Sequence, residues 1–150
     1  MTDVYRLVKA GRADDVLSGE GARLYGGRWN PPGTAVVYAS ESRALAVLEA
    51  FVHLTLEART MRFLLYAITL PTRPRLERVS PARRPRTLAG SQGAGRAWID
   101  AGAALALVVP SVIVPQEANY VLNVRHLQFA QVRVRKREAF SFDDRLWRGR

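Results

Sequence analysis

The chain has 150 residues, of which 48% are hydrophobic and 24% are charged. This length suits one domain with a proper core, and the composition excludes wholesale disorder. The absence of cysteine excludes disulfide scaffolds, thiolate metal sites and cysteine nucleophiles, and two histidines are too few for a histidine-rich metal site, so we expect no metal. The net charge of +10 should attract polyanions such as nucleic acid, nucleotide phosphates or an acidic protein.

No apolar run reaches 18 residues, and the first residues lack the charged-then-apolar pattern of a secretory signal. We therefore expect a cytoplasmic protein without a membrane partner.

The predicted elements make one domain over residues 1–150. Hydrophobic runs and β-favouring residues predict strands, with two shorter extended pieces, and helical patterning with Ser40 or Ser42 as a cap predicts two helices. A Gly-rich loop and a basic, proline-rich exposed loop lie between them. In chain order we expect a strand at 4–8, a loop at 9–33, a strand at 34–40, a helix to about 57, a strand at 62–70, a loop at 72–86, a helix at 88–101, a strand at 104–109, short extended pieces at 112–114 and 119–122, and a strand at 131–142.

Glu49 is the least expected residue of the first predicted helix. At about 100° per residue it falls on the same stripe as Leu45, Val52 and Leu56. Because burial of an unpaired charge is costly, this carboxylate is either paired, part of a cleft, or at the edge of the stripe where it reaches water. His53, one turn later, is a possible partner or a structural histidine.

The segment GGRWNPPG, residues 26–33, contains Arg28 between glycines and a proline pair. Glycines let the backbone approach a ligand closely, and a guanidinium group can bind a phosphate with two hydrogen bonds. The segment is neither a Walker loop nor a dinucleotide-binding fingerprint. By itself it indicates phosphate binding only weakly.

Tyr38 and Ser111 are candidates with ordinary alternatives. Tyr38 shares a strand face with Val36, which is typical of core packing with the hydroxyl at an edge. Ser111 follows a predicted buried strand and either closes a turn or points into a cleft. No GxSxG motif is present, so a hydrolase triad has little support.

These segments together resemble the RES domain, a family named for its Arg, Glu and Ser. The resemblance is carried by GARLYGGRWNPPGTAVVYAS, ALAVLEA, VVPSVIVP, NYVLNVRH and FSFDDRL, and it extends from Tyr5 to Leu146. One departure is Val124-Arg125-His126, where Asn-Pro is expected before the histidine. The resemblance implies an α+β fold similar to the ADP-ribosyltransferase toxins, with a split β-sheet core and flanking helices.

The resemblance also implies an NAD-consuming toxin of a type II toxin–antitoxin system, paired with an Xre-type antitoxin. NAD would be the substrate, cleaved at the nicotinamide–ribose bond by water or phosphate, and the alternative is transfer of ADP-ribose to a protein. Carried over by position, the catalytic residues are Arg28, Tyr38, Glu49 and Ser111, and Arg6 and Asn119 join Arg28 and Tyr38 in binding NAD.

The chemistry of these residue types suits that reaction. Cleavage develops positive charge on the ribose, which a carboxylate such as Glu49 can stabilise. Arg28 offers a partner for the pyrophosphate, Tyr38 an aromatic face and Ser111 a neutral hydrogen-bond partner. The nicotinamide leaves as a neutral base, so the reaction needs no general acid.

A different class, a basic nucleic-acid-binding module, is suggested by the net charge and by the arginines at 73, 75, 78, 83, 84 and 86. The alternative for these arginines is a solvated loop. Because no helix-turn-helix, zinc-finger or RNP pattern is present, we do not expect the chain to bind DNA directly without an antitoxin.

Overall fold

The computed structural model describes residues 1–149, without the side chains of residues 13–15. Its strands are β1 (Asp3–Lys9), β2 (Val36–Ser40), β3 (Phe63–Thr69), β4 (Leu76–Arg78), β5 (Ala106–Pro110), β6 (Ala118–Asn123) and β7 (Arg133–Phe140). Its α-helices are α1 (Glu20–Tyr25), α2 (Arg43–Phe51) and α3 (Leu88–Ala101), and 3-10 turns occupy Ala10–Asp15, Leu56–Thr60, Pro81–Arg83, Leu127–Gln131 and Asp144–Trp147. Among the described residues, no helix has the length and apolar character needed to span a membrane.

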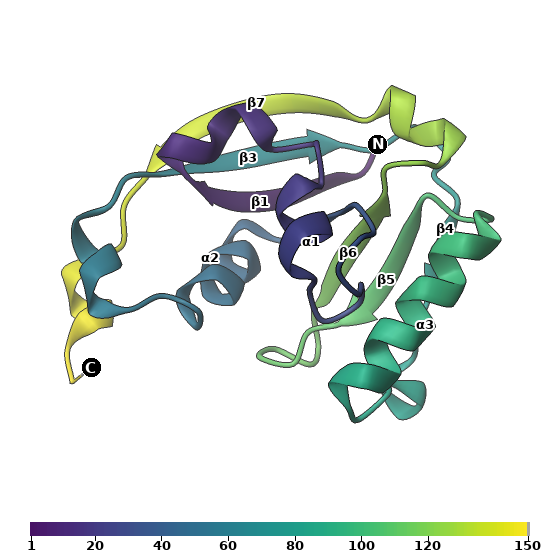
Figure 1. Cartoon of the computed structure of the whole chain (residues 1–150). Coiled ribbons are helices and arrows are strands. Elements are labelled where there is room, and N and C mark those ends of the chain that lie inside the picture. Colours follow the sequence, from purple (N-terminus) through teal and green to yellow (C-terminus); the bar gives the residue numbers. More distant parts are fainter. Residues whose placement is uncertain (150) are drawn as a thin grey trace.

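The strands form one sheet in the order β4-β5-β6-β2-β1-β3-β7, and this sheet is split between β2 and β1. These two strands pair only at Tyr5 and Ser40, whereas β1 and β3 pair along their whole lengths. Figure 1 shows β1, β3 and β7 as one set, while β5 and β6 run at a steep angle to it with α3 alongside. The α+β prediction with a split sheet is therefore confirmed.

The inner surfaces of the two half-sheets pack against each other. Val4 and Ile68 from one half meet Val37, Ala39 and Leu122 from the other in a single buried cluster. A second cluster fills the space between β2-β6-β5 and α3, around Trp29, Trp98 and Val121. Because only one residue pair joins β1 to β2, side-chain packing holds the half-sheets together more than backbone hydrogen bonds do.

Helix α2 is shorter than predicted. Ser42 caps it, because its side chain accepts a hydrogen bond from the backbone N–H of Leu45, but the helix ends at Phe51 instead of near residue 57. The ring of Phe51 packs 5.5 Å from that of Phe142 and 5.0 Å from that of Trp147, centroid to centroid, and anchors this end of the helix. The chain then leaves the helical path, so Val52 and Leu56 are half exposed rather than part of a buried stripe.

Two predicted loops and one extended piece need correction. The 9–33 loop contains a 3-10 turn and α1, and the 72–86 loop contains β4, which pairs in parallel with β5. Residues 112–114 form a bend instead of a strand. The closing strand spans Arg133–Phe140, and because β7 lies at the edge of the sheet, Val134 is exposed like its arginine neighbours. Helix α3 matches its predicted bounds, and Ala118–Asn123 contains the predicted piece at 119–122.

Candidate functional site

Glu49 lies in the last two turns of α2, half-buried, with its side chain turned toward the β5–β6 connection. Its Oε1 accepts two hydrogen bonds, from Ser111 Oγ at 2.7 Å and from Asn119 Nδ2 at 2.7 Å. Its Oε2 forms no hydrogen bond with any described residue. One oxygen therefore fixes the carboxylate in place, and the other remains able to contact a ligand.

Ser111 follows β5 directly and is fully buried, with no exposed surface. Its Oγ accepts hydrogen bonds from the backbone N–H groups of Ile113 and Val114, both at 3.0 Å, and donates to Glu49. These three bonds use the donor and both acceptor sites of the hydroxyl. Ser111 therefore holds the carboxylate and the bend after β5, and its buried hydroxyl is placed to position Glu49.

Asn119 is oriented by a residue on the neighbouring strand. Ser40 pairs with Asn119 across β2 and β6, and Ser40 Oγ donates to Asn119 Oδ1 at 2.7 Å. The amide oxygen is thereby occupied, and the amide nitrogen faces Glu49. A continuous chain of hydrogen bonds thus runs from β2 through β6 to α2.

Tyr38 lies two residues before Ser40 on the same face of β2, about 7 Å along the strand. Its hydroxyl accepts from the backbone N–H of Trp29 at 2.9 Å and donates to Asn30 Oδ1 at 2.7 Å. Burial raises the pKa of Tyr38 to about 12, so the hydroxyl keeps its proton at physiological pH. A Cβ at position 27 would lie 2.6 Å from this hydroxyl, which explains the glycine there.

Arg28 lies in the loop that Tyr38 anchors. Its side chain is exposed, lies close enough to Tyr38 to favour the ionised phenol, and forms no hydrogen bond or ion pair with any described residue. The loop around it is rigid: buried Asn30 donates from Nδ2 to the carbonyls of Ala22 and Thr34, and Gln92 of α3 donates to the Gly27 carbonyl at 2.9 Å. Arg28 is thus an exposed cation, without a described partner, on a loop that hydrogen bonds hold in place.

Arg6 lies on β1, where the sheet splits. Its Nη1 donates to the Tyr38 carbonyl at 2.7 Å, across the gap between the half-sheets, and its buried Nε has no hydrogen-bond partner. Burial lowers the pKa of Arg6, and no carboxylate forms an ion pair with it among the described residues. The half-buried Arg6 thus carries a positive charge that no described carboxylate neutralises, which favours an anionic ligand nearby.

The structure brings the predicted residues together in two connected groups. Glu49, Ser111 and Asn119 form one, Arg6, Tyr38 and Arg28 form the other, and Ser40 on β2 links them. His53 is exposed and is not the partner of Glu49.

Sequence reasoning missed three supporting side chains. Asn30 is inside the GGRWNPPG segment, and Ser40 is next to the predicted start of the first helix, so the sequence held a signal for both. No sequence pattern points to Gln92, because its hydrogen bond with Gly27 joins residues 65 positions apart. No group of three or more histidine, aspartate or glutamate side chains suited to a metal ion occurs in the described part of the chain.

The site therefore combines a split α+β sheet with a carboxylate fixed on one side and, on the other, two arginines that form no ion pair with a described residue. The RES domain model matches residues 3–143, so the chain belongs to the RES domain family. The chain is 38% identical, over 98% of both sequences, to a "Prs ADP-ribosylating toxin" from Sphingobium sp. (strain YBL2). It is 34% identical, over 95% of this chain and 96% of the other, to a "Toxin Res" from Photorhabdus laumondii.

The fold is also similar to a solved structure. A chain of the M. tuberculosis MbcT–MbcA toxin–antitoxin complex superposes with a TM-score of 0.77, over 93% of this chain and 84% of that one, at 23% identity. At this identity the likeness establishes the fold. The family identity suggested by the sequence motifs is confirmed.

Proposed function

We propose that the protein is an NAD-consuming toxin that breaks the nicotinamide–ribose bond, with Glu49 as its acidic group. The observation that carries the proposal is the Glu49 carboxylate, which is held through one oxygen by Ser111 and Asn119 and is open at the other. The relatives are named as toxins, which agrees with this proposal.

The reaction needs charge stabilisation more than proton transfer. The C1′–N bond breaks with its electron pair leaving on nicotinamide, which becomes neutral, while the ribose becomes an oxocarbenium-like cation. Glu49 Oε2 stabilises that cation or holds a ribose hydroxyl. A nucleophile then forms a new bond to this carbon, which is C1″ of the ADP-ribose product, and any proton that the nucleophile loses passes to solvent. A carboxylate that is already oriented needs little reorganisation during this step.

The arginines bind the other part of NAD. In this proposal, Arg28 contacts the pyrophosphate, and Arg6 supplies positive charge from the split between the half-sheets. No described carboxylate forms an ion pair with Arg6, so its positive charge attracts the phosphates from inside the split, although its buried Nε is itself out of their reach. Tyr38 fixes the loop of Arg28 and the strand carbonyl that Arg6 contacts, and Asn119 holds Glu49.

The acceptor of ADP-ribose is water or phosphate in the first form of the proposal and a protein side chain in the second. The name of the Sphingobium relative favours the second form, since that protein is described as ADP-ribosylating. We further propose an Xre-type antitoxin as partner, which agrees with the antitoxin in the structural neighbour. Co-purification of the two proteins from one cell tests this partner.

The decisive experiment is incubation of the pure protein with NAD, with and without phosphate, followed by identification of products by mass. We expect nicotinamide in all productive cases. ADP-ribose identifies hydrolysis, ADP-ribose 1″-phosphate identifies phosphorolysis, and an added mass of one ADP-ribosyl group on a protein identifies transfer. The last assay includes a cell lysate as the source of acceptors.

The control is Glu49→Gln, which keeps the size of the side chain and removes its charge. Wild-type protein that releases no nicotinamide, with or without phosphate and lysate, contradicts the proposal. Equal release by wild type and Glu49→Gln removes Glu49 from the mechanism.

A further inference from the structure

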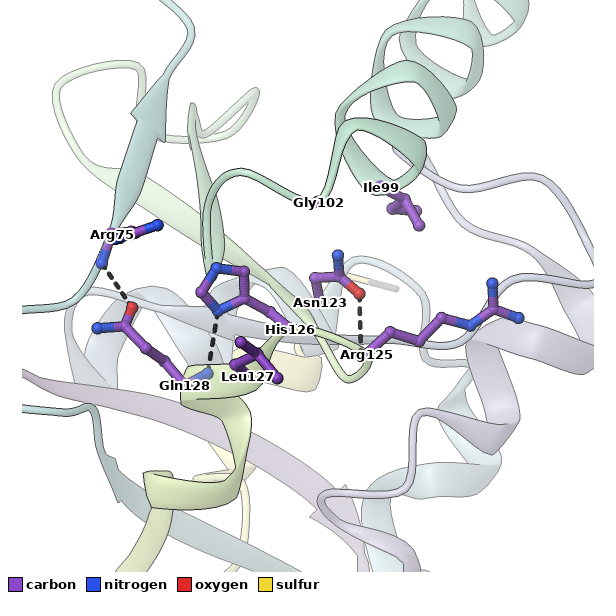
Figure 2. A pocket seen from close by; sticks show the side chains of 8 residues that line it. All are labelled: Arg75, Ile99, Gly102, Asn123, Arg125, His126, Leu127 and Gln128. Carbon is purple, nitrogen blue, oxygen red and sulfur yellow. Dashed lines mark hydrogen bonds between the residues drawn. The ribbon is translucent and has the colours of Figure 1, made fainter.

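A cavity of about 330 Å³ lies away from the candidate site, where the end of α3, the end of β6 and the segment before β4 meet (Figure 2). Its volume is at the lower end of the range for small-molecule pockets, roughly 300–1,000 Å³. Side chains on its wall include Arg75, Arg125, His126, Asn123 and Ile99.

The cavity is basic and holds no lining carboxylate. Neither Arg75 nor Arg125 forms a side-chain hydrogen bond or ion pair with any described residue, although other exposed arginines, such as Arg96 and Arg135, pair with carboxylates. Figure 2 shows these two arginines on opposite sides of His126. Two arginines without a described side-chain partner therefore line one cavity.

Hydrogen bonds between side chains and backbone N–H groups fix the wall between the two arginines. Gln128 Oε1 accepts from the Arg75 N–H at 2.9 Å, and the Gln128 N–H donates to His126 Nδ1 at 3.1 Å. Asn123, almost fully buried, accepts from the Arg125 N–H at 3.0 Å through Oδ1. These bonds hold both arginine backbones in position while their guanidinium groups remain available.

This cavity is separate from the Glu49 site. Asn119, which contacts Glu49, lies near one end of β6, and Asn123, which lines the cavity, ends the same strand. Four residue steps along the strand separate them by about 13 Å. Val121 lies between them, fully buried against Trp98 in the cluster beneath α3, so packed side chains fill the intervening space.

We propose that this cavity binds a small organic phosphate of about the size of a nucleoside monophosphate. A guanidinium group matches phosphate oxygens through paired N–H donors, and nothing on the wall repels an anion. Leu127, whose side chain is 91% exposed, provides an apolar surface for the organic part, and Ile99, almost fully buried, closes another part of the wall. The proposal does not depend on the activity assigned to Glu49.

The chain's two histidines, His53 and His126, make the test direct. We would record the imidazole NMR signals of the whole protein while adding AMP, inorganic phosphate, adenosine or sodium chloride at matched ionic strength. His126→Gln assigns the two signals. We expect AMP to move the His126 signal saturably, inorganic phosphate to do so more weakly, and neither to move the His53 signal.

Variants separate this cavity from the Glu49 site. The double variant Arg75→Gln, Arg125→Gln should weaken AMP binding at His126 at least tenfold. Arg125→Gln alone should weaken AMP binding to a lesser extent. The matched control, Arg73→Gln with Arg78→Gln, changes two exposed arginines of the same segment that do not line the cavity and should bind as wild type. Glu49→Gln should also retain binding.

Three results would overturn the proposal. The first is a His126 signal that moves no more with AMP than with chloride. The second is an equal response to adenosine and AMP, which would leave the phosphate without a role. The third is unchanged AMP binding in the Arg75→Gln, Arg125→Gln variant with a wild-type circular dichroism spectrum.

Discussion

The charged groups on the two sides of the candidate site differ in how many hydrogen bonds they form. On the α2 side, Glu49 receives two short hydrogen bonds from Ser111 and Asn119, which are themselves held by further bonds. On the other side, Arg28 has no described partner, and Arg6 has only a backbone carbonyl. Prearranged donors are typical of a group that must act without moving, whereas unsatisfied cations are typical of a surface completed by an anionic ligand.

The largest effect should come from the fixed side. Glu49→Gln should lower kcat for nicotinamide release about 10³-fold, because it removes the charge that stabilises the ribose cation. The glutamine keeps a carbonyl that can accept from Ser111, so the thermal unfolding temperature should change little. Nicotinamide release by chromatography and Tm by calorimetry check the two parts. A large fall in Tm alongside the lower kcat would assign Glu49 a structural role instead.

The next effect should come from the unpaired side and have a different kinetic form. Arg28→Ala should raise KM for NAD about 10- to 100-fold with a smaller change in kcat, because a charged hydrogen bond to phosphate contributes about 1.5–3 kcal/mol to binding. Initial-rate kinetics over a range of NAD concentrations measure it. An unchanged KM would argue against contact with the pyrophosphate. Arg23→Ala, an exposed arginine paired with Glu20 on α1, is the matched control.

A smaller effect should follow from loosening the carboxylate. Ser111→Ala should lower kcat about tenfold with little change in KM, since it removes one charged hydrogen bond from Glu49. A double-mutant cycle distinguishes positioning from general destabilisation. If Ser111 acts through Glu49, adding Ser111→Ala to Glu49→Gln should cost no further activity. Full additivity of the two losses would show that Ser111 does not act through Glu49.

The smallest effect concerns Tyr38 and appears only in alkali. Its folded-state pKa of about 12 lies above the ordinary value of 10.0, so its contribution to stability is complete below pH 10 and is lost as pH rises toward 12. By pH 12 the loss should be about 2 kcal/mol. Urea unfolding of wild type and Tyr38→Phe at pH 8 and pH 11 measures it. Between pH 8 and pH 11 the free energy of unfolding should fall less in the variant than in wild type. An equal fall would mean that a group other than Tyr38 ionises.

Much of the fold was predictable because hydrophobic runs mark buried strands. The strands around residues 63–69 and 106–110 and the helix at 88–101 match their patterns. The end of α2 was not predictable, because no glycine or proline marks it and Phe51 is held by aromatic rings almost a hundred residues away. Strand β4 was also missed, since three residues of a basic, proline-rich segment form a strand only beside β5.

The sequence supplied the candidate site residues, but it could not predict the contacts among them. The helical position of Glu49 raised the question of a partner, and the family motifs supplied Arg28, Tyr38 and Ser111. The actual partners of Glu49 lie 62 and 70 residues away, so helical spacing pointed to His53 instead. Gly95 shows the same limit: it weakens α3 in sequence, yet a Cβ there would lie 1.6 Å from the Trp29 carbonyl oxygen. The loop of Arg28 requires that glycine.

The single Tyr5–Ser40 pair between the half-sheets has a consequence for how such proteins diversify. Elsewhere in the sheet, strand spacing is set by backbone ladders and cannot vary with side-chain size. Across the split, the separation of Arg6 from β2 is instead set by the volumes of Val4, Val37 and Ala39 in the shared cluster. Substitutions at these buried positions, which no ligand contacts, would thus change the distance between the half-sheets and with it the ligand that fits between them.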